Sequence, residues 1–434
     1  MKRLPKLLLA ASVSAFVATG CLTLIQSATP AYAAERNGKE KDKKEETRHL
    51  QTMSQAVYAI IEKANKALDA KMYDDAIKYC NEALARKGLN EYEQVVSLQI
   101  RSYSQYYKDD VKDASAGFEK ILAIGATAEG LPDGLIDSIR YNLAQIYVVN
   151  GQYDKSIALL KQWLQTAANP SPDAYILLGQ AYAQQEKYKD AIPWYEKAID
   201  VAKAQNKDIS KDWYQNLGSM YMLTEQYKKA EPIWELLCEK WPNKNFMVTL
   251  ANLYGLVKRE KEMLGIFDAL YRQGKLDKST EIIQLSQLWQ YHDAPYRGAV
   301  ILKKGIESGI VEKNAKNLES LANAYVASDE IEKAIPFMTQ AAALSKDGNL
   351  YVQLAQAYIQ DEKWNQAADA LQKGFDKGNV DNKAQAQYLL GITQYNLAKY
   401  NDAKRTFALC QSDKSLGKNC QQYLQAIRQK ESQS

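Results

Sequence analysis

Residues 175 to 199 read YILLGQAYAQQEKYKDAIPWYEKAI, and the order of residue types in this stretch recurs along most of the chain. The most similar second copy is WYQNLGSMYMLTEQYKKAEPIWELL, at residues 213 to 237. The residues at identical offsets are Leu178 and Leu217, Gly179 and Gly218, Tyr182 and Tyr221, Tyr188 and Tyr227, Ala191 and Ala230, Tyr195 and Trp234, and Ala198 and Leu237. A pattern that returns about every 34 residues predicts a stacked array of repeats instead of a single closed core.

Each copy of the pattern predicts two helices. Leu178, Gly179 and Tyr182 share one face of a first helix, because residues three and four apart are neighbours on a helical surface. Ala191 and Tyr195 are spaced in the same way on a second helix. The small residue at Gly179 marks a place where the two helices must approach closely. The polar run between them is short, which favours a tight antiparallel turn.

About ten units follow this template along residues 51–412. The second-helix Ala or its substitute falls at Ala76, Ala114, Ser156, Ala191, Ala230, Met263, Ala299, Ala334, Ala367 and Ala403. The units at Ala114, Met263 and Ala299 are irregular, with altered connections such as AIGATAEGLPDG and YHDAPYRG. The pattern resembles the tetratricopeptide repeat, which implies an all-α superhelical solenoid of antiparallel helix pairs. Residues 413–434 are expected to form a C-terminal capping helix and tail.

The N-terminal residues differ in composition from the repeats. A basic start and an apolar run end in small residues around Ala33, so residues 1–33 are interpreted as a signal peptide. Two alternatives are a lipoprotein anchored through Cys21 and a retained membrane anchor. Residues 34–50 carry charges of both signs and are expected to form a flexible charged segment. We therefore expect an exported chain in the periplasm.

The charge balance gives no indication of a nucleic-acid partner. The chain has 56 Lys and Arg residues against 52 Asp and Glu. Removing Lys2, Arg3 and Lys6 with the signal peptide leaves 53 basic residues against the same 52 acidic ones. A nearly neutral chain lacks the basic patch that binds a phosphate backbone.

Export also changes the interpretation of the cysteines. Cys410 and Cys420 enclose a short turn before the capping helix, and a chain reversal there would bring them within disulfide range. We expect a disulfide between them that secures the end of the array. Cys80 and Cys238 lie about four repeats apart, too far to pair, and are expected to be buried as small apolar residues.

Catalysis finds little support in the sequence. His49 and His292 are the only histidines, and neither belongs to a metal-binding or catalytic motif. The sequence has no GxSxG motif and no phosphate-binding loop. We therefore expect no enzyme activity, no catalytic residue, no metal site and no cofactor.

Recognition of another protein is the remaining class of function. In repeats of this kind the first helices line a concave groove, and the residue after the small Gly or Ala points into it. Those candidate partner-binding residues are Gln145, Gln180, Ser219, Asn252, Asn323 and Gln356. Amide side chains can pair with the backbone of an extended peptide. The alternative is a merely solvated inner face.

The residue two positions before the conserved Leu also bears on how a partner would bind. Some tetratricopeptide domains grip a C-terminal carboxylate with a Lys two residues before the conserved Leu. The equivalents in this chain are Tyr141, Ile176, Gln215, Val248, Glu319 and Val352, none of them basic, so that mode is not expected.

Tyr296 and Arg297, in the Pro-containing turn of YHDAPYRG, are a possible contact turn for a partner, or they pack on the next repeat.

A narrower resemblance covers residues from about Asn142 to Tyr400. The runs FDALYRQGKLDKSTEIIQLSQLWQYHDAPYRGAVILKKGIESGIVEKN and LANAYVASDEIEKAIPFMTQAAALSKDG resemble the exported tetratricopeptide proteins of Gram-negative bacteria described as components of a TonB system. The resemblance implies a periplasmic scaffold accessory to TonB, ExbB and ExbD in the uptake of iron-siderophore or haem. The alternative function is a general envelope scaffold or chaperone, for wall synthesis or outer-membrane assembly, with no link to iron.

Overall fold

The structure is a computed structural model that describes residues 51–433, and within this range it contains helices and no strand. The predicted signal peptide, the charged segment at residues 34–50 and Cys21 lie outside the described residues. The chain divides into two compact units, Met1–Pro242 and Asn243–Ser434, called unit 1 and unit 2 below. In the part of the chain that the structure describes, no helix combines the length and apolar composition that a membrane span requires.

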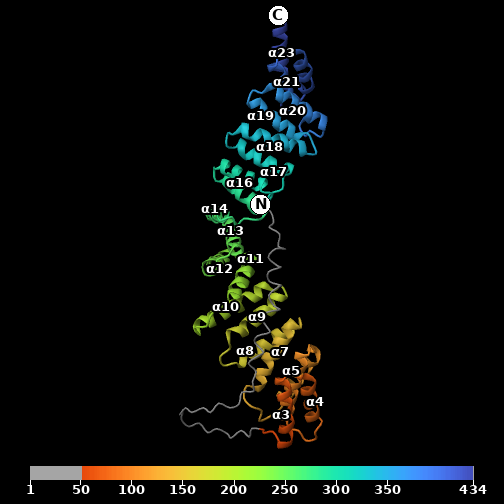
Figure 1. Cartoon of the computed structure of the whole chain (residues 1–434), viewed down its shortest axis with the longest axis vertical. Helices are drawn as coiled ribbons and strands as arrows, with labels where there is room; N and C mark the ends of the chain where they lie inside the picture. The colour runs from red at the N-terminus through yellow and green to blue at the C-terminus, as the bar shows by residue number, and fades with distance from the viewer. Residues whose placement is uncertain (1–50, 434) are drawn as a thin grey trace. The chain divides into compact units, whose positions relative to one another are not determined.

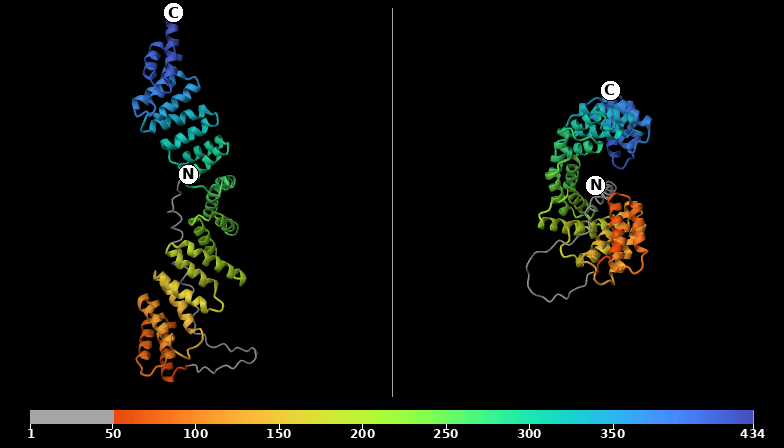
Figure 2. Two further views of the ribbon diagram at one scale, coloured as in Figure 1. Left: turned by 180° about the vertical axis from the view of Figure 1, so that it is seen from behind. Right: turned by 60° about the horizontal axis from the view of Figure 1, so that its bottom comes forward.

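The described helices form ten pairs and one final helix (Figure 1). Unit 1 contains α3 (Gln55–Asp69), α4 (Tyr73–Leu84), α5 (Glu91–Tyr107), α6 (Val111–Gly125), α7 (Leu135–Val149), α8 (Tyr153–Thr166), α9 (Pro172–Gln184), α10 (Tyr188–Ala204), α11 (Lys211–Leu223) and α12 (Tyr227–Lys240). Unit 2 contains α13 (Lys244–Leu256), α14 (Glu260–Arg272), α15 (Ser279–Tyr291), α16 (Pro295–Glu307), α17 (Ala315–Val326), α18 (Ile331–Leu344), α19 (Asn349–Gln360), α20 (Trp364–Lys377), α21 (Lys383–Asn396), α22 (Tyr400–Cys410) and α23 (Gly417–Gln433). Within each unit, consecutive pairs pack beside one another in chain order (Figure 2).

All ten pairs use the same turn between their first and second helices. The residue two positions before each second helix has a positive φ. These residues are Lys71, Asp109, Gly151, Glu186, Glu225, Lys258, Asp293, Asp329, Glu362 and Ala398. The next residue donates its backbone N–H to a carbonyl five residues earlier, as in the bond from Lys187 to Tyr182. This is the left-handed helix ending that satisfies otherwise unpaired carbonyls.

The common turn corrects one expectation from the sequence. The segment YHDAPYRG was expected to be an altered connection, but Asp293 occupies the same left-handed position there as in the other nine turns. The pair α15 and α16 is therefore regular. The other segment, AIGATAEGLPDG, includes the connection from α6 to α7, and its Gly130 carbonyl accepts a hydrogen bond from the Gln51 backbone N–H.

The small residue of the first helix lies where an aromatic side chain of the second helix crosses it. A Cβ added to Gly179 would lie 2.7 Å from Cδ2 of Tyr195. At Gly391 the added Cβ would lie 2.5 Å from Cε1 of Phe407. Tyr195 and Phe407 are among the largest fully buried side chains of the chain. The close approach expected from the sequence is thus a property of the folded pairs, and the aromatic ring fills the space that glycine leaves.

In unit 1, neighbouring pairs are joined by a recurrent polar contact. The Tyr147 hydroxyl on α7 donates to the Glu119 carboxylate on α6, and Lys155 on α8 pairs with that carboxylate at 3.0 Å. Tyr221, Glu196 and Lys229 repeat this arrangement on α11, α10 and α12. The hydrogen bond from Tyr147 and the charge of Lys155 lower the pKa of Glu119. The contact at Glu119 therefore favours the ionised carboxylate, and its contribution to stability falls as the pH drops through the folded pKa of Glu119.

In unit 2, the start of α13 is tied to the start of α15 by a partly buried ion pair. Lys244 Nζ lies 2.9 Å from Oε2 of Glu281, and it also pairs with Asp277. Glu281 is only 5% exposed. Burial by itself lowers the pKa of Lys244, but the hydrogen bonds and charges of the two carboxylates outweigh it, so the pKa is raised. The stability gained from this pair is present at neutral pH and is lost as the pH rises through the folded pKa of Lys244.

The last helix, α23, covers the end of unit 2. Its Tyr423 ring stacks on Phe407 of α22 with ring centroids 4.8 Å apart. Cys410, at the end of α22, forms a disulfide with Cys420 in α23, the pair expected from the sequence, and both residues are fully buried. Leu424 and Ile427 complete the same apolar cluster. An otherwise open end of the helix array is thereby closed by apolar packing and a covalent link.

Candidate functional site

The six residues expected to line a groove differ in their exposure. Gln145 and Ser219, on α7 and α11 of unit 1, are 7% and 3% exposed. Gln180, Asn252 and Gln356 are half-buried, and Asn323 is exposed. Side chains as covered as Gln145 and Ser219 present little surface to a ligand. The accessible amides therefore lie mostly in unit 2, on α13, α17 and α19.

The structure adds Gln287 of α15 to these amides. The left-handed turn residue Asp293 lies seven positions after Ser286, as Glu186 lies seven positions after Gly179. Ser286 is therefore the small residue of α15, and the exposed Gln287 directly follows it. The sequence template missed this position because serine replaces the usual Gly or Ala. We call Asn252, Gln287, Asn323 and Gln356 the amide row of unit 2.

Neighbouring first helices in this unit are also joined through amides. The Gln284 side-chain amide on α15 donates to Oδ1 of Asn252 on α13, at a donor–acceptor distance of 3.1 Å. An amide offers two N–H donors and one carbonyl acceptor, so each of these side chains retains capacity for further hydrogen bonds. Such groups match the alternating donors and acceptors of an extended peptide backbone.

A second row of side chains lies one helical turn before the amide row. These residues precede the small residue by three positions and share a helix face with the amide that follows it. They are Val248, Ile283, Glu319, Val352 and Tyr388, on α13, α15, α17, α19 and α21, and all are half-buried. We call this set the apolar row, although Glu319 stands within it. An apolar stripe beside an amide stripe can hold both the side chains and the backbone of a peptide.

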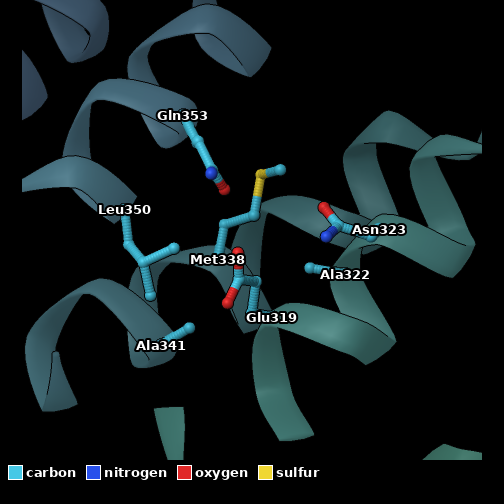
Figure 3. A pocket seen from close by; sticks show the side chains of 7 residues that line it. All are labelled: Glu319, Ala322, Asn323, Met338, Ala341, Leu350 and Gln353. Atoms are coloured by element: carbon cyan, nitrogen blue, oxygen red, sulfur yellow. The ribbon is translucent and has the colours of Figure 1, made fainter. Parts of the chain in front are cut away.

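The two rows meet at a shallow, open hollow between α17, α18 and α19 (Figure 3). It is lined by Glu319, Ala322, Asn323, Met338, Ala341, Leu350 and Gln353. In the close view, the amides of Asn323 and Gln353 lie on either side of the Met338 side chain. The floor is apolar, because Met338 and Ala341 belong to the buried face of α18. The hollow therefore combines an apolar base, two amides and one carboxylate.

Tyr296 and Arg297 do not lie in a turn, in contrast to the expectation from the sequence. They belong to the first turn of α16, which begins at Pro295 because proline is well suited to that position. Arg297 donates from one guanidinium N–H to Oδ1 of the buried Asp268 at 2.8 Å, and its guanidinium lies 3.8 Å from the centre of the Trp289 ring. Arg297 is thus engaged within unit 2. Tyr296 remains 45% exposed.

Two free cysteines and one histidine lie among the described residues. Burial raises the pKa of the Cys80 thiol to about 12 and that of Cys238 to about 11, so both thiols stay protonated at neutral pH. His292 ends α15 beside the ring of Tyr291. Within residues 51–433, no three or more His, Cys, Asp or Glu side chains are grouped so that they could hold a metal ion.

Comparison with known proteins identifies the repeat. Residues 135–204 match the tetratricopeptide repeat. The matched residues are those of α7 to α10, which are two complete pairs, and the other pairs share their turn. The fold is therefore an all-α solenoid of helix pairs of the tetratricopeptide repeat type. No curated protein matches this sequence.

Solved structures with similarity to this chain include other tetratricopeptide proteins. MamA from Desulfovibrio magneticus RS-1, from residue 41 to its end, is 20% identical over 43% of this chain and 96% of its own, with a TM-score of 0.36. A tetratricopeptide repeat protein from Parabacteroides merdae is 15% identical over 79% of this chain and 100% of its own, with a TM-score of 0.36. The TPR2AB domain of yeast Sti1, in complex with pHSP90, is 12% identical over 68% of this chain and 99% of its own, with a TM-score of 0.31.

Proposed function

We propose that this protein is a protein–protein interaction scaffold that binds an extended segment of a partner on the first helices of unit 2. The observation that carries the proposal is the pairing of the amide row with the apolar row on α13, α15, α17 and α19. Amides can bond the backbone of a segment of any sequence, while apolar residues bury its side chains. This combination suits a peptide better than a small charged metabolite.

We also propose a cellular compartment and a partner system for this scaffold. We place the protein in the periplasm, accessory to TonB, ExbB and ExbD in the uptake of iron-siderophore or haem, with a periplasmic segment of one of these proteins as its ligand. The support is the sequence resemblance over residues from about Asn142 to Tyr400 and the signal-like N-terminus. The buried disulfide between Cys410 and Cys420 is consistent with this setting, since such bonds persist in oxidising compartments.

The test is a crosslinking pull-down of the tagged protein from iron-starved cells. Recovery of TonB, ExbB or ExbD supports the transport role. Changing Asn252, Gln287 and Asn323 to Ala should weaken that recovery if the amide row holds the segment. Gln145→Ala is the matched control, because this amide is covered in unit 1. Recovery of wall-synthesis or outer-membrane assembly proteins instead would replace the transport role with the general envelope scaffold.

A further inference from the structure

We propose that the hollow between α17, α18 and α19 is a specificity pocket for a lysine or arginine side chain of the bound segment. The inference rests on the proposed function, because it assumes that a peptide lies along the amide row. One residue of that peptide would then carry a basic side chain that enters the hollow. It also assigns Glu319 a role in selecting the partner.

Charged side chains are rare along the amide row and the apolar row. Of the ten side chains at these positions on α13, α15, α17, α19 and α21, only that of Glu319 is an acidic or basic side chain. The others are the amide row, Ile392 after Gly391, and the four remaining members of the apolar row. Along these two rows a bound peptide would therefore meet one charged side chain. An isolated carboxylate in a half-buried site attracts a cation and disfavours an anion.

The carboxylate of Glu319 has no partner in the part of the chain that the structure describes. Among the described residues, no ion pair or hydrogen bond engages its carboxylate, although Lys316 lies three residues earlier on the same helix. By contrast, Asp268 in this unit is held by Arg272 and Arg297, and Glu281 by Lys244. Unlike those carboxylates, Glu319 remains available to a ligand.

The lining of the hollow suits a long side chain with a charged end. Lysine and arginine have a long apolar stem and a charged end. The side chains of Ala322, Met338 and Leu350 offer apolar contacts for the stem, and the Glu319 carboxylate lies at the same hollow for the charged end. Asn323 and Gln353 add amide carbonyls that can accept further hydrogen bonds from a guanidinium or ammonium group. An acidic side chain would find no cation among the residues that line this hollow.

The proposal can be tested with peptide libraries and the purified full-length protein. Degenerate octapeptides that share one fixed residue, either Arg, Lys, Gln or Glu, would be compared by fluorescence anisotropy. The libraries with Arg or Lys should bind most tightly. Glu319→Gln keeps the size of the side chain and removes its charge, so it should weaken binding of these two libraries about tenfold, as expected for one charge pair in a half-buried site. Binding of the Gln library should change little.

Glu332→Gln is the matched control, because it removes the same charge from the exposed start of α18, outside the residues that line the hollow. It should leave the preference for basic libraries intact. Glu319→Lys should reverse the preference towards the Glu library, and circular dichroism would verify that each variant remains helical. Equal binding of all four libraries by the unmodified protein would overturn the pocket and leave the scaffold proposal standing. Absence of binding to every library would overturn both.

Discussion

Reduction of the disulfide between Cys410 and Cys420 should loosen the C-terminal end of unit 2 and leave the rest of the chain unaffected. The two cysteines are ten residues apart, and closing a loop of that size lowers the entropy of the unfolded segment by an amount worth about 2.7 kcal/mol. Because a repeat array opens locally from its ends, this free energy concerns the opening of α22 and α23. It corresponds to about a hundredfold change in the opening equilibrium.

The assay is amide hydrogen exchange of the protein refolded with and without a reducing agent. Amides of α23 should exchange about a hundredfold faster after reduction, in line with the loop-closure term. Amides around the free, buried Cys80 on α4 should keep their rates. A change in α23 below about threefold would refute the argument from loop entropy. A uniform change from α3 to α23 would refute the idea that the array opens locally.

Three further predictions concern single contacts within a pair or between neighbouring pairs. Ala398→Gly should stabilise the pair α21 and α22 by about 0.5–1 kcal/mol, measured by urea unfolding, because alanine is strained at its φ of 57° and glycine is not. Lys244→Met should destabilise unit 2 by about 3–5 kcal/mol, since it leaves the buried carboxylate of Glu281 without its cation, and the additional change Glu281→Leu should recover most of that loss in the same assay. Gly179→Ala should destabilise unit 1 by about 1–3 kcal/mol in thermal unfolding, because its Cβ would press on the Tyr195 ring; an unchanged midpoint would show that the ring can move aside.

The repeat explains why much of the fold could be predicted from the sequence. Gly179 and Tyr195 recur at fixed offsets, and a close helix crossing permits only small residues opposite an aromatic ring, so the pattern itself specifies the pair. The turn was harder to recognise. Its left-handed position is occupied by Glu186 in one pair and Asp293 in another, so no single residue type marks it.

The candidate site depended on contacts that the sequence does not reveal. Arg297 was proposed as a partner contact, yet its guanidinium pairs with Asp268, 29 residues earlier and on another helix pair. The hollow at Glu319 is formed by three helices, so its lining depends on how they pack. Gln287 was found only through the position of Asp293 in the structure, because no residue type marks the turn in the sequence.

The shared left-handed turn bears on how arrays of this kind change in length. The shared turn lies inside each pair, between its first and second helices. The connections between pairs differ, since the chain is extended after α8 and α18 but has a positive φ at Gly274 and Gly309 after α14 and α16. A genetic duplication or deletion of one whole pair would therefore leave the turn inside every pair unchanged and would alter only a connection between pairs. In unit 1 the change would also disturb side-chain contacts between neighbouring pairs, such as the hydrogen bond from Tyr147 to Glu119. Those interfaces and the connections between pairs, and not the turns inside them, would then limit which lengths of the array survive in evolution.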